Sequence, residues 1–282
     1  MDTRVSTAGK EVTIGDGRPT VLIGERINPA GKKKLTEALK SGNLEIVRTE
    51  ALAQVQAGAD IIDVNISAFG VDETSLLPRA VQAVMDTVDV PLCLDSPNPQ
   101  ALAAALKVYK GKALINSVTG EEHSLANVLP LVKAHAAAVI GLLQDDDGIP
   151  RNSERRLAIA RKIMERAEAS GIPREDVIID CLASAVGADA TSGMTVIESI
   201  RRIRNELGVN ITLGASNVSF GLPERGLLNN TFVAIAISAG ATSLIVDVAS
   251  VRPTVLATDL ILGRDKRARR YIEDFRQRHW IP

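Results

Sequence analysis

Short apolar runs alternate with longer amphipathic segments along most of this chain. The apolar runs are rich in Val, Ile and Leu and too short for buried helices, which favours strands of a parallel sheet. The eight predicted strands are 20–24, 60–64, 91–95, 113–116, 138–141, 177–180, 211–213 and 243–246. Between them, apolar residues recur at helical spacing. These segments predict helices such as 73–88, 99–109, 122–134, 155–170 and 196–207.

Eight strand-helix units in this order predict an α/β fold, a (β/α)8 TIM barrel closed by right-handed crossovers. A doubly wound open sheet is the weaker alternative because it needs fewer strands and a glycine-rich first turn. The first turn here is Gly24-Glu25-Arg26-Ile27-Asn28. No linker rich in Gly, Pro or Ser divides the chain, so we expect residues 1–282 to form a single domain.

Both ends of the chain lie outside the repeating pattern. Residues 1–19 are polar, and we expect an N-terminal extension in which 11–14, followed by Gly15-Asp16-Gly17, predicts a small hairpin. The segment 265–282 is expected to be a C-terminal helix, most of it over 265–278. Its high charge indicates a solvated outer face, with a contact between subunits as the alternative.

Composition narrows the class of protein. The chain has 45% hydrophobic but only 2% aromatic residues, which suits close packing of helices on strands. A net charge of −1 argues against nucleic acid as a partner, since phosphate binding needs a basic surplus. No apolar run approaches the roughly 20 residues of a membrane span, and no signal peptide is evident. Cys93 and Cys181 lie in or beside predicted strands, which favours a reduced, cytoplasmic location.

Polar residues stand where five of the predicted strands end. They are Asp63 and Asn65, then Asp95, then Asn116, then Asp180, and finally Gly214, Ser216 and Asn217. One such residue alone is more often a turn or cap residue, and we expect Ser96 and the segment 117–119 to cap helices. Capping does not explain the recurrence. The carboxyl ends of barrel strands meet at one mouth, so these tips predict a shared binding site.

The chemistry of the tips indicates the kind of ligand. An ionised carboxylate only accepts hydrogen bonds, whereas an amide both donates and accepts. Together they match a flat heterocycle with an amidine-like N–H edge and a carbonyl, such as a 2-amino-4-oxo pterin. A phosphorylated ligand would need basic residues or a glycine-rich loop, which are scarce among the tips.

Other chemical groups carry less weight. The three histidines, His123, His135 and His279, lie on predicted helices without neighbours at metal-ligand spacing, so no bound metal is expected. The run 32–34 of three lysines is expected to be a solvated helix start. The run 145–147 of three aspartates is expected to be an exposed turn before a helix beginning at Asn152, in preference to a cation-binding loop.

An ordered set of motifs carries a resemblance to a known family. The motifs are Ile23-Gly24-Glu25-Arg26-Ile27-Asn28, Asp63-Val64-Asn65, Leu92-Cys93-Leu94-Asp95-Ser96, Ile115-Asn116-Ser117, Ile179-Asp180 and Ser216-Asn217-Val218-Ser219-Phe220. Together they resemble the pterin-binding methyltransferase family. That family includes methyltetrahydrofolate:corrinoid protein methyltransferases and the folate-binding module of cobalamin-dependent methionine synthase, on a dihydropteroate-synthase-like barrel. The likeness covers roughly residues 20–263.

The resemblance implies roles for the tips. Asp95, Asn116 and Asp180 would hold the pterin, Gly214 and Ser216 would line it, and Asn217 would lie near N5, the atom that carries the methyl group. The further substrate-binding residues implied are Asp63, Asn65, Glu25 and Asn28. Asn217, Asp95 and Asp180 would also be the catalytic residues.

The resemblance implies partners and leaves alternatives open. Tetrahydrofolate or 5-methyltetrahydrofolate would be the substrate, and a corrinoid (cobalamin) would be carried by a separate corrinoid-binding protein, as in one-carbon, acetogenic or O-demethylation pathways. A homodimer is also implied. The alternatives are a non-catalytic folate-binding subunit and a dihydropteroate synthase. A barrel lyase or aldolase is disfavoured because Lys112 precedes its strand and would lie at the wrong end.

Overall fold

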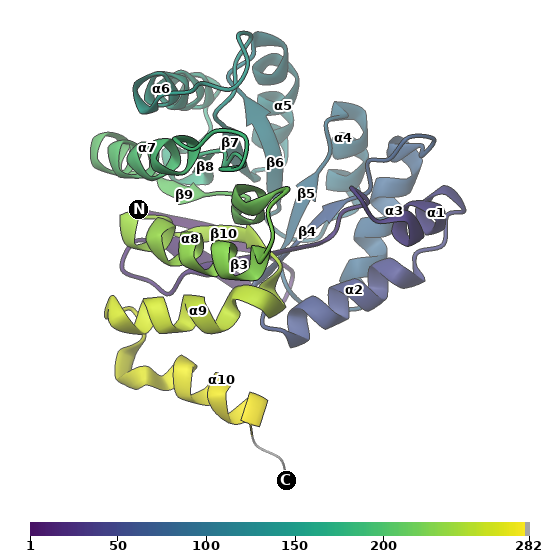
Figure 1. Cartoon of the computed structure of the whole chain (residues 1–282). Helices are drawn as coiled ribbons and strands as arrows, with labels where there is room; N and C mark the ends of the chain where they lie inside the picture. The colour runs from purple at the N-terminus through teal and green to yellow at the C-terminus, as the bar shows by residue number, and fades with distance from the viewer. Residues whose placement is uncertain (280–282) are drawn as a thin grey trace.

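The computed structural model describes residues 1–279 and contains an eight-stranded parallel sheet (Figure 1). Its strands, in chain order, are β3 (Val21–Ile27), β4 (Ile61–Asn65), β5 (Leu92–Asp95), β6 (Leu114–Thr119), β7 (Ala138–Leu142), β8 (Val177–Asp180), β9 (Asn210–Thr212) and β10 (Ser243–Val246). The sheet order is β10-β3-β4-β5-β6-β7-β8-β9. A bridge between Gly214 and Ile245 joins the two edge strands, so the sheet closes into the predicted barrel.

Helices surround the barrel and follow the predicted segments closely. They are α1 (Lys33–Lys40), α2 (Glu45–Gln56), α3 (Glu73–Met85), α4 (Pro99–Val108), α5 (Glu122–Ala134), α6 (Ser153–Ala169), α7 (Ser192–Leu207), α8 (Arg225–Ala239), α9 (Val248–Ile261) and α10 (Arg269–His279), with short 3-10 turns η1 (Arg174–Asp176), η2 (Ala215–Ser219) and η3 (Lys266–Ala268). No helix within residues 1–279 is long and apolar enough to cross a membrane.

The capping prediction was wrong for Ser96 and for the segment 117–119, since the cap position of α5 is Glu121. The residue that caps α4 is Asn98, whose side chain accepts hydrogen bonds from the backbone N–H groups of Gln100 and Ala101. Ser96 instead donates its hydroxyl to Glu73. Helix α6 begins at Ser153, beside the predicted start at Asn152, and Asn152 caps it.

The N-terminal extension closes the amino-terminal end of the barrel. Strands β1 (Asp2–Ser6) and β2 (Glu11–Gly15) form an antiparallel hairpin. The hairpin was predicted, but its turn lies before residues 11–14 and not at 15–17. Val5, Val12 and Ile14 of the hairpin are buried in one cluster with inward-facing barrel residues. Asn210 anchors it, since Nδ2 donates to the carbonyl of Ile14 at 2.9 Å.

The C-terminal segment lies against α9 at the margin of the barrel (Figure 1). Helix α10 begins at Arg269, four residues later than the predicted start at 265, and residues 280–282 of this segment lie outside the described part. Most of α10 is solvated, as predicted, but Asp274 is buried and pairs with Arg252 of α9 at 2.7 Å. This ion pair fixes the helix to the barrel.

Candidate functional site

Three neighbouring strands bring predicted tips together at the carboxyl end of the barrel. Strand pairing aligns Asn65 of β4 with Asp95 of β5, and Asp95 with Asn116 of β6. The amide of Asn65 donates to the Asp95 carboxylate at 2.8 Å, and the amide of Asn116 donates to Asp63 at 3.2 Å. Each amide thus donates to a carboxylate of another strand, and the carbonyl oxygen of the Asn116 amide can accept a hydrogen bond from a ligand.

The other side of the mouth is built by β3, β8 and the segment after β9. Ser216 of η2 donates its hydroxyl to Glu25 of β3 at 2.6 Å. Asp180 accepts from the backbone N–H of Leu182 at 2.7 Å and from that of Gly214. The two sides therefore lie at one end of the barrel: Glu25, Asp180, Gly214 and Ser216 on one, and Asp63, Asn65, Asp95 and Asn116 on the other. We call the side chains of Asp63, Asn65, Asp95, Asn116 and Asp180 the ring.

Burial dominates the electrostatics of the four carboxyl groups at the mouth. It raises the pKa of Glu25, and it raises the pKa of Asp95 and of Asp180 to about 6. The pKa of Asp63 lies well above its ordinary value because burial is joined by repulsion from the Asp95 carboxylate. Among the described residues, none of the four forms an ion pair with Lys or Arg. These four carboxyl groups therefore have no directly paired cation among the described residues, which favours ligands that donate hydrogen bonds to them.

Two other predicted residues, Asn217 and Asn28, lie outside the ring. Asn217 is exposed on η2, next to Ser216, so its amide can reach a ligand above the mouth. Asn28 follows the end of β3, where its side chain accepts the backbone N–H of Ala30 at 2.9 Å. A role for either residue in binding stays a prediction.

A supporting layer behind the ring was not predicted from the sequence. Glu73 accepts hydroxyl hydrogen bonds from Ser67 and Ser96, at 2.9 and 2.5 Å, and Ser67 donates its backbone N–H to the side chain of Asn65. This network fixes the loops that follow β4 and β5. The only local signal was the acidic residue in the first turn of α3, which is also a common helix start.

A second unpredicted support lies behind β3. Gln54 of α2 accepts the backbone N–H of Arg26 at 2.8 Å, at the place where β3 shifts register against β4. The side chain fits only because Gly24 has no Cβ, which would lie 2.4 Å from Gln54 Oε1. Lys32, predicted to be solvated, is half-buried and donates to the carbonyl of Arg26 at 2.7 Å.

A hollow of about 290 Å³ adjoins the ring between the loops after β5 and β6. Asp95 and Asn116 form its inner wall, and Glu121 and His123 lie at its outer side. Within residues 1–279 no group of three His, Cys, Asp or Glu side chains is placed to hold a metal ion.

Solved structures with the same architecture define the fold class. The chain superposes on a Yersinia pestis dihydropteroate synthase with a pterine-sulfa conjugate with a TM-score of 0.72 at 17% identity, covering 93% of this chain and 100% of the other. A Xanthomonas albilineans dihydropteroate synthase with 4-aminobenzoic acid gives a TM-score of 0.70 at 19% identity, covering 93% and 99%. The fold is therefore a dihydropteroate-synthase-like (β/α)8 barrel, as predicted.

Sequence comparison identifies the family. Residues 24–247 match the pterin binding enzyme family, and the chain belongs to it. The chain is 32% identical over 267 residues to a methylcorrinoid:tetrahydrofolate methyltransferase of Eubacterium limosum, covering 91% of this chain and 96% of the relative. It is 28% identical over 262 residues to methionine synthase of Mycobacterium tuberculosis, covering 88% of this chain but 22% of that larger protein. The predicted resemblance and the prediction of an enzyme are confirmed.

Proposed function

We propose that this protein transfers a methyl group between N5 of tetrahydrofolate and the cobalt of a corrinoid carried by a separate protein. The observation that carries the proposal is the ring of Asp63, Asn65, Asp95, Asn116 and Asp180 around one barrel mouth without a paired cation. The Eubacterium limosum relative supports the reaction and favours the direction from the methylated corrinoid to the folate.

The ring suits a pterin for a physical reason. The 2-amino group and adjacent N–H of a pterin are neutral donors, and Asp95 and Asp180 are buried acceptors that no cation in residues 1–279 pairs with. Hydrogen bonds from the ligand would offset the burial of these carboxylates. The amide of Asn116 can complete the edge by accepting a further N–H.

Residues near N5 would control the proton and the line of attack. In methyl transfer to folate, the N5 lone pair forms the new N–C bond while the methyl–cobalt bond breaks, its electron pair stays on cobalt, and N5 gives up a proton. We infer that Asn217 orients N5 through its amide and that Asp95 or Asp180, through water, takes the proton. Most of the rate gain would come from holding N5 in line with the methyl group. In the reverse direction the same groups would protonate N5 as it leaves.

Two alternatives are less well supported. A dihydropteroate synthase would need basic side chains for substrate phosphates near η2. Arg225 does reach η2, but its guanidinium donates to Ser216 and Ser219. A Schiff-base lyase would need a lysine at the mouth, whereas Lys112 lies at the opposite end, paired with Asp176. A non-catalytic folate-binding subunit would use the same ring, so an assay of methyl transfer is needed to distinguish it from a methyltransferase.

The experiment is a methyl-transfer assay with a methylated corrinoid protein, or free methylcobalamin, and tetrahydrofolate. We expect loss of the methylcobalamin absorbance together with formation of 5-methyltetrahydrofolate. Folate binding without any change in the cobalamin spectrum would identify a carrier and overturn the proposal. Calorimetry with Asp95→Ala, Asn116→Ala and Asp180→Ala should show folate affinity reduced by about 1–3 kcal/mol each. Unchanged affinity in all three would show that the pocket assignment is wrong.

The oligomeric state is a separate proposal. We infer a homodimer from the resemblance alone, and sedimentation velocity of the purified protein at several concentrations tests it. A single species with the 30.0 kDa mass of one chain would contradict it.

A further inference from the structure

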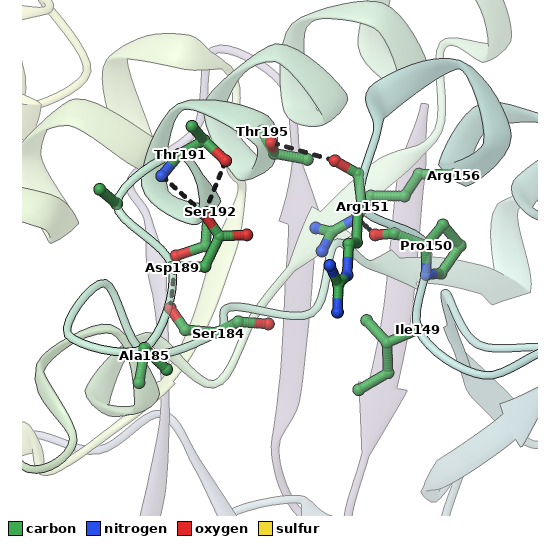
Figure 2. A pocket seen from close by; sticks show the side chains of 12 residues that line it. Ile149, Pro150, Arg151, Arg156, Ser184, Ala185, Asp189, Thr191, Ser192 and Thr195 are labelled. Atoms are coloured by element: carbon green, nitrogen blue, oxygen red, sulfur yellow. Dashed lines mark hydrogen bonds between the residues drawn. The ribbon is translucent and has the colours of Figure 1, made fainter.

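A second large hollow lies outside the ring, between the loop that joins β7 to α6 and the loop that joins β8 to α7 (Figure 2). Its volume is about 840 Å³, which is within the usual range of small-molecule sites. Ile149 and Pro150 contribute one wall, and Ser184 and Ser192 lie across from them. The segment that follows Asp180 separates this hollow from the barrel mouth.

The floor of the hollow contains a buried arginine that forms no ion pair within residues 1–279. Arg156 is 2% exposed, and its guanidinium donates to the carbonyl groups of Pro150 at 3.0 Å, Cys181 at 2.6 Å and Leu182 at 3.1 Å. Three carbonyl groups satisfy hydrogen bonds but do not neutralise the charge. The Asp180 carboxylate attracts this charge from the barrel side without an ion-pair contact. Buried charges in proteins are normally paired directly, so a guanidinium that lacks such a pair beside a cavity favours an anion there.

A second arginine faces the same hollow. Arg151 is exposed, and its guanidinium forms no hydrogen bond or ion pair with any residue in 1–279. Figure 2 shows the Arg151 and Arg156 side chains both reaching toward the middle of the hollow. The opposing charge at the rim is Asp189, whose carboxylate accepts the N–H and hydroxyl of Thr191. Arg151 and Arg156 are thus opposed by Asp189 at the rim and by Asp180 from the barrel side, and the N–H groups of the Arg151 guanidinium make no hydrogen bond within residues 1–279.

We propose that this hollow is a binding site for an organic anion that presents a carboxylate or phosphate group to Arg151 and Arg156. Guanidinium groups recognise both kinds of group through paired N–H donors. The volume exceeds the need of an inorganic ion, and Ile149 and Pro150 on one side, with Ala185 across from them, supply apolar surface for a carbon skeleton. This site is distinct from the ring around Asp95 and Asp180, and it does not depend on the proposed methyl transfer.

The test is calorimetric titration of the folate-free protein with inorganic phosphate and, separately, with glutarate. We expect saturable binding of at least one of them, weakened about tenfold or more in Arg151→Met because charge-assisted hydrogen bonds are lost. The matched control is Arg155→Met, since Arg155 precedes Arg156 in the sequence but pairs with Asp145 and Asp147 on the outer surface. Asp189→Asn should tighten binding because it removes the opposing charge.

The same titrations can overturn the proposal. No saturable binding of either anion to the wild-type protein would do so, as would equal affinities in Arg151→Met and Arg155→Met. The source of the anion is decided by measuring how Arg151→Met changes the affinity for two ligands. One is tetrahydrofolate, and the other is a tetrahydropterin that lacks the glutamate tail. Arg151→Met weakens only tetrahydrofolate if the glutamate tail occupies the hollow, and weakens neither if a separate metabolite does.

Discussion

Replacing Asp180 by asparagine tests whether the barrel mouth buries a carboxyl group at a cost to stability. Burial raises the pKa of Asp180 from an ordinary value of 3.8 to about 6. A raised pKa in the folded state means that the folded protein binds this proton more tightly than the unfolded chain does. The stability contributed by the proton is therefore fully present below pH 3.8 and is lost as the pH rises through about 6.

The magnitude follows from these two pKa values. Between pH 5 and pH 7.5 the contribution of Asp180 to the free energy of unfolding should fall by about 1.4 kcal/mol. Asparagine does not ionise, and its side-chain oxygen can still accept the N–H of Leu182, which lies 2.7 Å from the carboxylate. The stability of Asp180→Asn relative to wild type should therefore rise by about 1.4 kcal/mol over this pH interval.

Urea denaturation of the folate-free protein at both pH values measures this difference. Asp146→Asn is the matched control, because Asp146 is an exposed carboxylate in a loop at the same end of the barrel. A difference between Asp180→Asn and wild type that is the same at both pH values would refute the reasoning. It would mean that Asp180 titrates alike in the folded and unfolded protein.

Three further substitutions probe other parts of the molecule. Asn217→Ala should lower the methyl-transfer rate by about a hundredfold while folate affinity by calorimetry changes little, and an equal loss of both would assign Asn217 to binding alone. Ile14→Ala should lower the free energy of unfolding by about 2–5 kcal/mol in urea, because it leaves a cavity where the hairpin fills the barrel; an unchanged midpoint would show that the hairpin is dispensable. Gly24→Ala should cost about 1–3 kcal/mol through its clash with Gln54, and a stability within experimental error of wild type would contradict that packing.

The barrel and its tips were predictable because both depend on local patterns. Apolar runs with helical segments between them fix the strand order, and polar residues at strand ends fall at the mouth once the barrel closes. The supports of the tips were not predictable, since Glu73 and Gln54 act through contacts between elements distant in sequence. The hairpin turn was misplaced because β1, with its polar residues around Val5, resembles a loop until its pairing with β2 is known.

Arg156 shows how a usable signal can be overlooked. It stands in a strongly charged stretch beside Arg155, and the composition of that stretch indicates a solvated helix face. Its helical spacing, however, places it on the same stripe as Ala160, Ile163 and Ala167, all of which are buried. A charged residue on an otherwise apolar stripe should therefore be examined as a candidate site residue.

The raised pKa values of the carboxyl groups at the mouth link the stability of the fold to ligand binding. Glu25, Asp63, Asp95 and Asp180 are held in a buried setting that disfavours their charged forms, so these groups lower the stability of the fold near neutral pH. A ligand that donates N–H groups to them restores what burial removed, and it binds the folded state alone. Ligand binding then raises the free energy of unfolding by RT ln(1 + [L]/Kd), where the hydrogen bonds to these carboxyl groups and the apolar contacts both contribute to Kd. The groups that lower the stability of the barrel are thus the groups that make it selective for a donor-rich heterocycle.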